Sequence, residues 1–498
     1  MCAQLLCGKA SLILLDINLP DGSLLLISKL SGDLGVDMFL QEVQGLEDIY
    51  YAAFPDAPPM IYFRPPSGNC NEWVLKMADM MTDITLLETA KKANVSVHAW
   101  INPYRVSQKN IFGQNLDALA ENNPARLHPE WVVKYTDGAM YYNPGLPEVR
   151  ELIVAGVEEI ITRYDVDGIH FDDYFYPSGG TTEGSSAPDY KDYQSSGTTL
   201  SIGDWRRENV NKMVKDVYDA IQAKRPDVRF GISPAGVSSK SASKYGLSSP
   251  SSYGVSASDW QYAQIYSDPL AWLAEGTIDF ISPQCYWPTT HSTAPYEKLT
   301  KWWSYAAPKF GRHYYASQES SDLGGGELSN TTSGWSEMNK QILFNRQYDT
   351  NNAPGTIFYS AAYINGNKAD GFGDYLKANA FAYKSLTPVV TWKTGSTYGK
   401  VANAAYNNGT LSWTETKNGN AIIRYTVYAM PMSVTINQAK ASDGDGFAVE
   451  YLQDVIEVSS WENFSYYYEK LKQYANKNDI EIIGDISELP DLKEMSKE

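Results

Sequence analysis

The 498-residue sequence has few of the residues that bind metals or form disulfide bonds. Its four cysteines, Cys2, Cys7, Cys70 and Cys285, form no CxxC motif, and its five histidines are scattered along the chain. Neither set has the spacing of a zinc site. The sequence therefore implies no metal and no organic cofactor.

Long hydrophobic runs are also missing. No apolar run reaches the roughly 18 residues that a membrane-spanning helix needs, so we expect no transmembrane helix. The short apolar stretch Ala10–Leu15 is followed by Asp16 and lacks the basic segment that opens a signal peptide. We therefore see no secretory signal in this sequence.

The sequence has fewer positive than negative side chains: 41 lysines and arginines and 59 aspartates and glutamates, which gives a net charge of −18. This balance disfavours a nucleic-acid backbone or an anionic membrane as the partner. Aromatic residues are abundant, with 36 tyrosines and 13 tryptophans. Exposed aromatic rings can stack on the apolar faces of sugars, and buried ones only fill a core, so both interpretations stay open.

Strand-like and helix-like patterns alternate over residues 1–385. The predicted strands are Ala10–Asp16, Val36–Val43, Val95–Ile101, Val166–Phe171, Arg229–Ser233, Thr277–Ser282, His313–Ala316 and Thr356–Ser360. Helical spacing covers Trp73–Asn94, Glu148–Tyr164, Trp205–Lys224 and Ser336–Arg346, whereas residues 178–203 and 238–258 have the composition of long loops. About eight such alternations predict an α/β protein with a (β/α)₈ barrel, the TIM barrel, provided that residues 10–45 supply two of its strands.

The composition changes after residue 385. Strand patterns at Val389–Trp392, Gly409–Trp413 and Ile422–Tyr428 are separated by Asn-Gly turns, which predicts a small β-sandwich over residues 386–456. Residues 457–498 form an acidic tail, with a helical pattern at Trp461–Asn478 and a short strand at Ile480–Ile483.

Two adjacent carboxylates end one of the predicted strands. Asp172 and Asp173 follow Val166–Phe171 and precede Pro177. Carboxylates are costly to bury, and the carboxyl ends of parallel strands are where α/β folds place their chemistry. A solvated pair of aspartates that caps a loop is the plainer alternative. Alternation along the strand puts His170 and Asp172 on one face and turns Asp173 toward the other.

Five motifs occur in order around this segment: Val97–Val106, Asp167–Pro177, Asp204–Asn209, Phe230–Pro234 and Ser282–Trp287. Together they resemble the bacterial glycosyl-hydrolase-like family ten, which includes an envelope enzyme that cuts peptidoglycan glycan strands free of stem peptides. Residues 1–94 match the family least, and residues 386–456 resemble an incomplete fibronectin type III module.

The resemblance implies a glycosidase with a (β/α)₈ barrel that acts on a cell-wall glycan or a related N-acetylated polysaccharide, in the envelope or outside the cell. Asp172 and Asp173 would be catalytic. Substrate contacts would come from Trp100, Asn102, Tyr104, Arg105, His170, Tyr174, Tyr176, Arg206, Asn209, Ser233, Gln284, Tyr286 and Trp287.

Glycoside hydrolysis needs a carboxylic acid that protonates the leaving oxygen and usually a second carboxylate. Two close carboxylates can supply the acid, because each raises the pKa of the other. Asp167–Pro177 also resembles a chitinase strand, in which case Asp172 would orient an acetamido group and Asp173 would be the acid. Glu42 and Glu319, which follow other predicted strands, are further candidates for the second carboxylate.

Several alternatives remain open. Arg105 could clamp the carboxylate of a muramyl sugar, form an ion pair with Asp172, or lie in solvent. The aromatic residues could stack on sugars or fill the barrel rim. The chain could also be a carbohydrate-binding protein without catalytic activity. A segment at Leu14–Gly22 resembles the phospho-acceptor strand of response regulators, with Asp16 as acceptor, which would make the chain a signalling fusion.

Overall fold

The structure is a computed structural model of the chain. It describes residues 95–393, apart from residues 108–113, 120, 136–137, 178–183, 325–331, 352, 365–366, 383–387 and 389. Outside that range it describes Leu87, Ala90 and short strands between residues 2 and 64 and between residues 402 and 483. The chain forms two compact units, and His98–Gly395 with Tyr428–Gln453 make up the second.

The centre of the second unit is a six-stranded sheet in the order β13-β12-β11-β10-β9-β5. All of its neighbouring strands are parallel. The strands are β5 (His98–Ile101), β9 (Gly168–Phe171), β10 (Arg229–Ile232), β11 (Phe280–Ile281), β12 (His313–Glu319) and β13 (Gly355–Tyr359). Six of the predicted strands are therefore confirmed, and so is the α/β class.

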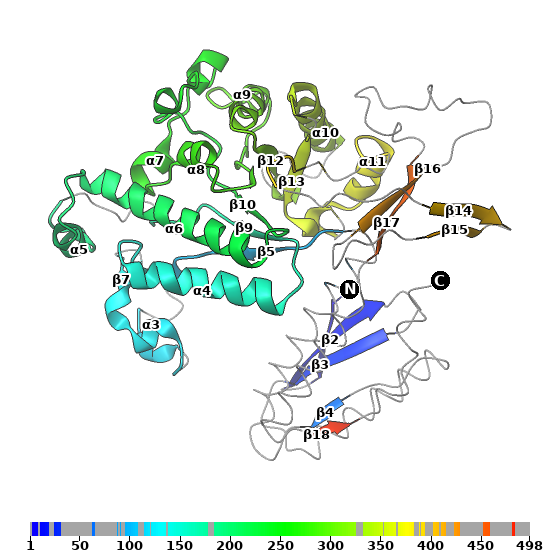
Figure 1. Cartoon of the computed structure of the whole chain (residues 1–498), viewed down its shortest axis with the longest axis horizontal. Coiled ribbons are helices and arrows are strands. Elements are labelled where there is room, and N and C mark those ends of the chain that lie inside the picture. Colours follow the sequence, from blue (N-terminus) through cyan, green and yellow to red (C-terminus); the bar gives the residue numbers. More distant parts are fainter. Residues whose placement is uncertain are drawn as a thin grey trace. The chain divides into compact units, whose positions relative to one another are not determined.

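Helices follow these strands in the chain. They are α3 (Pro124–Leu127), α4 (Pro147–Arg163), α5 (Tyr190–Ser195), α6 (Ile202–Lys224), α7 (Trp260–Gln264), α8 (Pro269–Glu275), α9 (Tyr296–Lys309), α10 (Thr332–Tyr348) and α11 (Phe372–Ala378). The long helices α4, α6, α9 and α10 cover one side of the sheet (Figure 1). In α4 every fourth residue from Val149 to Ile161 is buried, as helical spacing requires. Among the described helices, none is both long and apolar enough to span a membrane.

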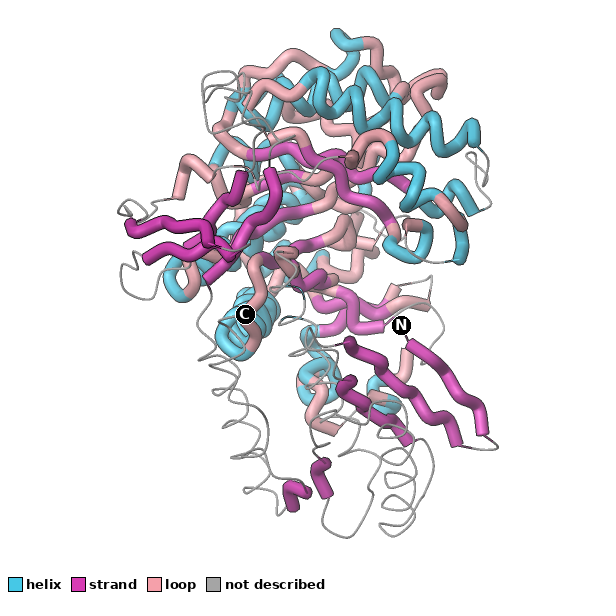
Figure 2. The backbone as a smooth tube through the Cα atoms, turned by 90° about the vertical axis from the view of Figure 1, so that its right-hand side faces the viewer, coloured by secondary structure: helices cyan, strands magenta, loops and turns pink. Residues whose placement is uncertain are grey.

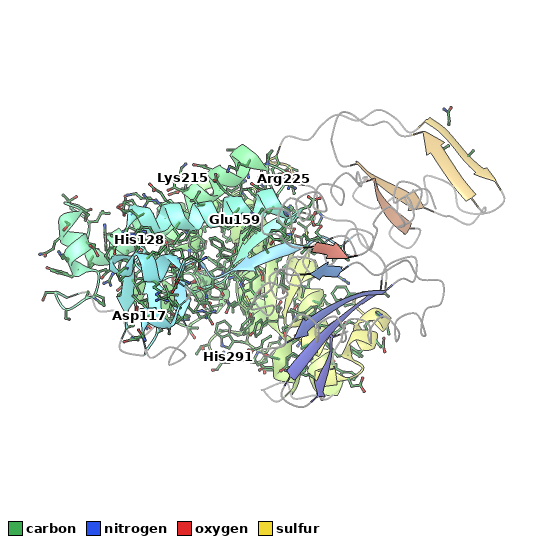
Figure 3. All side chains as sticks on the ribbon, turned by 90° about the horizontal axis from the view of Figure 1, so that it is seen from below. Asp117, His128, Glu159, Lys215, Arg225 and His291 are labelled. Atoms are coloured by element: carbon green, nitrogen blue, oxygen red, sulfur yellow. The ribbon has the colours of Figure 1, made fainter. Side chains whose placement is uncertain are left out.

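Charged residues cover the outer sides of these helices. Glu159 of α4 and Lys215 of α6 are both labelled in Figure 3, and each side chain is 54% exposed. Each forms a pair with a neighbour one turn away on its own helix. In Figure 2 the helices lie outside the strands of the sheet, so the apolar faces of the helices and the sheet form the core between them.

The face of the sheet turned away from the helices is concave and filled with rings. Phe280 lies near its centre, 5.6 Å from the His98 ring and 5.3 Å from the Tyr315 ring, measured between centroids. A glycine on a neighbouring strand makes room for each ring: a Cβ at Gly231 would lie 2.1 Å from the Phe280 ring, and one at Gly168 would lie 2.4 Å from His98. We call this side the inner face.

The sheet is curled. Trp100 and Tyr359 lie at the ends of β5 and β13, the two edge strands, yet their ring centroids are 6.4 Å apart. Side chains of opposite edges meet only when a sheet bends toward closure. The described strands therefore form a half-barrel, and closure by two further strands stays a prediction.

The end of the half-barrel opposite the strand tips is closed by residues 390–393. Asp279 is fully buried and accepts hydrogen bonds from Phe230 N at 2.8 Å and from Trp392 Nε1 at 2.6 Å. Lys393 Nζ lies 3.0 Å from the same carboxylate. The predicted strand Val389–Trp392 is wrong, because residues 391–393 form a turn that brings Trp392 and Lys393 to Asp279.

The predicted first barrel strand lies elsewhere. Residues Ala10–Asn18 do form a strand, β2, but it pairs antiparallel with β1 (Cys2–Cys7) and β3 (Leu24–Leu30) in the first unit. Its use as a parallel barrel strand is therefore wrong. Only two residues separate β1 from β2, and a parallel pairing needs a crossover of a dozen residues or more. The predictions for Val36–Val43 and Trp73–Asn94 fall outside the described residues, apart from Leu87 and Ala90.

The long segments between strands contain more structure than their composition predicts. After β5, strands β6 (Arg105–Ser107), β7 (Val132–Lys134) and β8 (Met140–Tyr142) form an antiparallel sheet. The prediction of a loop over residues 178–203 is wrong at α5, which is held by a 2.7 Å hydrogen bond from Asn143 to Asp192. Residues 238–258 contain two 3₁₀ turns, Ser243–Tyr245 and Pro250–Tyr253.

Strands beyond residue 400 occur as two-stranded sheets in the described residues. β14 (Ala402–Asn407) pairs with β15 (Thr410–Thr414), β16 (Ile423–Tyr428) with β17 (Leu452–Val458), and β18 (Glu481–Ile483) with β4 (Tyr62–Arg64). The predicted strands at residues 409–413, 422–428 and 480–483 are confirmed. The fibronectin type III-like sandwich stays a prediction, and Trp461–Asn478 lies outside the described residues.

Candidate active site

The two predicted catalytic carboxylates follow β9 directly. The strand ends at Phe171, whose carbonyl accepts the Ser233 amide of the next strand at 2.8 Å. A tight turn follows, in which Tyr174 N donates to Asp172 Oδ1 at 3.2 Å. Asp173 accepts a hydrogen bond from the Gln284 side chain, which follows β11. Strand alternation therefore does not turn Asp173 away, because the chain has left the strand before this residue.

The Asp172 carboxyl is the more enclosed of the two, with 4% of the residue exposed. Its burial raises its pKa to about 7, and the negative charge of Asp173 acts in the same direction. The Tyr174 amide and the positive charge of Arg105 oppose this shift. Burial also raises the pKa of Asp173, and the hydrogen bond from Gln284 opposes it. At neutral pH a substantial fraction of Asp172 is therefore protonated and able to donate a proton.

Arg105 and Asn102 lie beside this pair, after β5. The Arg105 guanidinium lies over the Tyr174 ring, 4.9 Å from its centroid. Asn102 Oδ1 accepts the Arg105 amide at 3.3 Å and so fixes the turn. In the part of the chain that the structure describes, Arg105 forms no ion pair with Asp172.

Gln284 and Ser233 connect the next two strand ends. Gln284 Nε2 donates to the Ser233 carbonyl at 3.1 Å, and the Gln284 backbone bridges β10 and β12. The Ser233 hydroxyl donates to the Ser282 carbonyl at 2.7 Å, and Ser282 and Ser317 share a 2.7 Å hydrogen bond. This buried serine network fixes Gln284 and, through it, Asp173. The sequence did not point to Ser317, because the predicted strand ended at Ala316 whereas β12 continues to Glu319.

Exposed aromatic rings surround the carboxylates. Trp100 is 61% exposed, Tyr359 is 48% exposed and Tyr174 is 44% exposed. Tyr286, partly buried, lies 6.4 Å from Tyr359 between ring centroids. Trp287 is also partly buried, and its ring packs so closely on Gly236 that a Cβ there would lie 2.8 Å from it. The structure thus brings Trp100, Tyr174, Tyr286 and Trp287 to the strand-tip end, and adds Tyr359.

Four other predicted substrate contacts are buried. Tyr104 and Tyr176 are each 1% exposed, and neither hydroxyl has a hydrogen-bond partner in the described residues. Arg206 is fully buried and binds Asp189 through two hydrogen bonds of 2.8 and 2.5 Å. Asn209 is 6% exposed. The structure does not place these side chains at an accessible surface, and the bonds of Arg206 show that it connects α6 to α5.

His170 lies on the inner face of β9, two residues before Asp172. Its ring centroid is 5.6 Å from that of Phe280, and burial lowers its pKa to about 4. No hydrogen bond joins it to Asp172 among the described side chains. The geometry agrees with a neutral imidazole packed below the carboxylates.

Of the two further candidates for a second carboxylate, Glu319 lies at this end of the sheet and Glu42 lies outside the described residues. Glu319 is the last residue of β12, and Ser321 Oγ donates to its Oε1 at 2.8 Å. Burial raises the pKa of Tyr286, and the charges of Glu319 and Asp173 add to the effect. No cluster of three His, Cys, Asp or Glu residues able to hold a metal occurs in the described ranges.

Comparisons with known proteins place the sequence among similar chains. The sequence model of the family described as "Glycosyl hydrolase-like 10" matches residues 69–331. The chain is 36% identical over 343 residues to "Glycosyl hydrolase YngK" of Bacillus subtilis strain 168, covering 68% of this chain and 62% of that protein. It is 32% identical over 302 residues to "Glycosyl hydrolase DigH" of Escherichia coli K12, covering 59% of this chain and 66% of that protein. The chain therefore spans less than two thirds of either relative.

Among solved structures, the chain is similar to the PgaB (BpsB) glycoside hydrolase domain from Bordetella bronchiseptica. The TM-score is 0.37 and the sequence identity 11%, over 59% of this chain and 77% of that domain. We draw no functional conclusion from this likeness.

Proposed function

The chain belongs to the glycosyl hydrolase-like 10 family, and from this premise we propose that it hydrolyses a glycosidic bond in a bacterial cell-wall glycan. The substrate would be peptidoglycan strands free of stem peptides or a related N-acetylated polysaccharide. The observation that carries the proposal is the Asp172 carboxyl, whose pKa burial raises to about 7 at the end of a parallel strand. A carboxylic acid that is still protonated at neutral pH is what the first step of glycoside hydrolysis requires.

We assign the acid role to Asp172. The acid donates its proton to the glycosidic oxygen while the bond from that oxygen to the anomeric carbon breaks, and the leaving sugar departs as a neutral alcohol. This reverses the roles of the chitinase-like hypothesis, in which Asp173 is the acid. Burial raises the pKa of Asp173, and hydrogen bonds from its own backbone amide and from Gln284 oppose this shift. As a carboxylate it would stabilise the positive charge that develops on the sugar ring.

The aromatic rings would bind the sugar rings on either side of the cleaved bond. Trp100, Tyr174 and Tyr359 are the most exposed of them, and an exposed ring can stack on the apolar face of a sugar. Arg105 is held over Tyr174. It would pair with the lactyl carboxylate of a muramyl residue.

A cell-wall substrate implies that the protein works in the cell envelope or outside the cell, and we propose this location. We also propose that residues 386–456 form the fibronectin type III-like accessory segment that the sequence predicts. The location depends on the substrate class, and the accessory segment depends on the strand pattern of residues 386–456.

The test is to incubate the protein with peptide-free glycan strands and with intact sacculi, and to measure released fragments by liquid chromatography and mass spectrometry. Asp172→Ala is the inactive variant. Asp374→Asn, which changes a side chain that is 88% exposed, is the control. Release of fragments by the wild type and the control, but not by Asp172→Ala, supports the proposal.

The same experiment, repeated at several pH values, tests the protonation state of Asp172. Because the protonated form of Asp172 is the active one, kcat/KM should fall about tenfold for each pH unit above about 7. Binding to the glycans without release of any fragment would instead show a carbohydrate-binding protein without catalytic activity, and would overturn the proposed function.

A further inference from the structure

Glu319 occupies a position on the inner face at the end of β12. It pairs in register with Tyr359 of β13, and alternation along β12 puts it on the same face as Ser317 and Tyr315. The Tyr315 ring lies on the inner face, beside Phe280. Glu319 therefore points toward the same mouth as Asp172, from a strand three places away in the sheet.

Two of the buried carboxylates have a cation beside them, whereas Asp259 and Asp268, each 3% exposed, accept hydrogen bonds from neutral donors. Asp189 is paired with Arg206, and Asp279 with Lys393. Glu319 forms no ion pair with any residue that the structure describes, and its one hydrogen bond comes from Ser321. A carboxylate at a strand tip that no cation neutralises can accept a proton from a bound water molecule.

Tyr286 connects Glu319 to Asp173, the neighbour of the candidate acid Asp172. Its ring stacks beside Tyr359 at 6.4 Å between centroids, and the charges of Glu319 and Asp173 both act on its hydroxyl. Carboxylates from the ends of β9 and β12 therefore lie near the same ring, that of Tyr286. That is the arrangement needed to hold a sugar between two carboxyl groups.

For the closed eight-stranded barrel that the sequence predicts, ideal strand geometry gives the expected separation. A barrel of eight strands about 4.8 Å apart and tilted by about 36° has a radius of roughly 7.5 Å. Strands three places apart then lie roughly 14 Å apart across the mouth, and the two side chains together reach roughly 6 Å inward. The carboxyl groups of Asp172 and Glu319 would be roughly 8 Å apart, which is within the range for inverting glycosidases and too far for retaining ones.

We propose that Glu319 is the catalytic base of this site and that the reaction inverts the anomeric configuration. Glu319 takes a proton from a water molecule while the water oxygen bonds to the anomeric carbon. On the opposite side the bond to the leaving sugar breaks, and its oxygen takes the proton of Asp172. This inference rests on the proposed glycosidase function, since it names the second carboxylate of that same site.

The experiment follows the configuration of the first product by proton NMR in D₂O, with peptide-free glycan strands as substrate. The wild type should give the inverted anomer. Glu319→Gln should lower kcat by about 10²–10⁴-fold while glycan affinity stays within about twofold. Glu297→Gln, a change on α9 where the carboxylate accepts the Tyr348 hydroxyl, is the matched control and should keep full activity.

Azide separates a base from a residue that only supports the fold. Glu319→Ala should recover turnover with added azide and release a sugar azide of inverted configuration, because azide attacks without a base. An active wild type with retained configuration, an active Glu319→Gln variant or a lack of azide rescue would each overturn the inference and leave the proposed function standing. A wild type that releases no sugar would overturn the proposed function, and this inference with it.

Discussion

Replacing Asp172 by asparagine should make the protein more stable at alkaline pH. The pKa of Asp172 is about 7 in the folded state and returns to its ordinary value of 3.8 on unfolding. Between these values the folded state binds more protons than the unfolded state, so stability falls as the pH rises from about 4 to about 7. A pKa difference of about 3 units lowers the free energy of unfolding by about 4 kcal/mol at pH 8. At pH 5 this reduction is only about 1.5–2 kcal/mol.

The asparagine of the Asp172→Asn variant would avoid this cost at every pH, because an amide does not ionise. Its Oδ1 can still accept the hydrogen bond that Tyr174 N now donates to the carboxylate. The advantage of Asp172→Asn over the wild type should therefore grow by about 2–3 kcal/mol between pH 5 and pH 8. For a unit of this size, that corresponds to about 5 °C in the unfolding temperature.

The assay is calorimetric unfolding of wild type, Asp172→Asn and Asp374→Asn at both pH values. The exposed Asp374→Asn control should show no pH-dependent gain. An equal difference between Asp172→Asn and wild type at pH 5 and pH 8 would refute the reasoning, since it would mean that Asp172 ionises as readily when folded as when unfolded. The Asp172→Asn variant should also lose hydrolytic activity, because active-site residues are often kept for function although they lower stability.

Three further changes test the surroundings of this site. Trp100→Ala should raise KM several-fold, because the exposed ring would stack on the substrate. Since the side chain is 61% exposed, kcat and the unfolding temperature should stay almost unchanged. Steady-state kinetics on glycan strands would measure the change in KM. Lys393→Met leaves the buried Asp279 carboxylate without its cation and should lower the free energy of unfolding by about 3 kcal/mol, which calorimetry would detect; an unchanged transition would contradict this. Gly231→Ala puts a Cβ 2.1 Å from the Phe280 ring and should cost about 1–3 kcal/mol, and a second change of Phe280→Leu should recover part of the loss.

The strands of the sheet were predictable because their pattern is local. Residues 166–171 and 229–233 are short strand-like patterns followed by turn residues, and both form strands close to these bounds. The same local reasoning failed for Val389–Trp392. Its alternation is that of a strand, but the Trp392 indole and the Lys393 ammonium reach Asp279, which is more than 100 residues away in the chain. A contact of that range leaves no trace in local periodicity.

In the candidate site, too, some residues were predictable from local motifs and others depended on long-range packing. Asp172, Asp173 and Gln284 could be named from their motifs, and the structure brings them together. Arg206 comes from an equally well-matched motif, but its guanidinium is fully buried against Asp189. Which motif residue reaches the mouth depends on the packing of other elements over it, and one sequence does not record that packing.

The sequence by itself determined the alternating α/β pattern and the position of two carboxylates at the end of a strand. Both follow from side-chain periodicity and from proline and glycine positions within short windows. Only the tertiary structure decided that Asp173 turns toward Gln284, that Tyr359 approaches Trp100 across the curled sheet, and that Asp172 is enclosed enough for a pKa near 7. Enclosure and charge depend on atoms brought together from distant parts of the chain, so these properties arise only when the sheet curls.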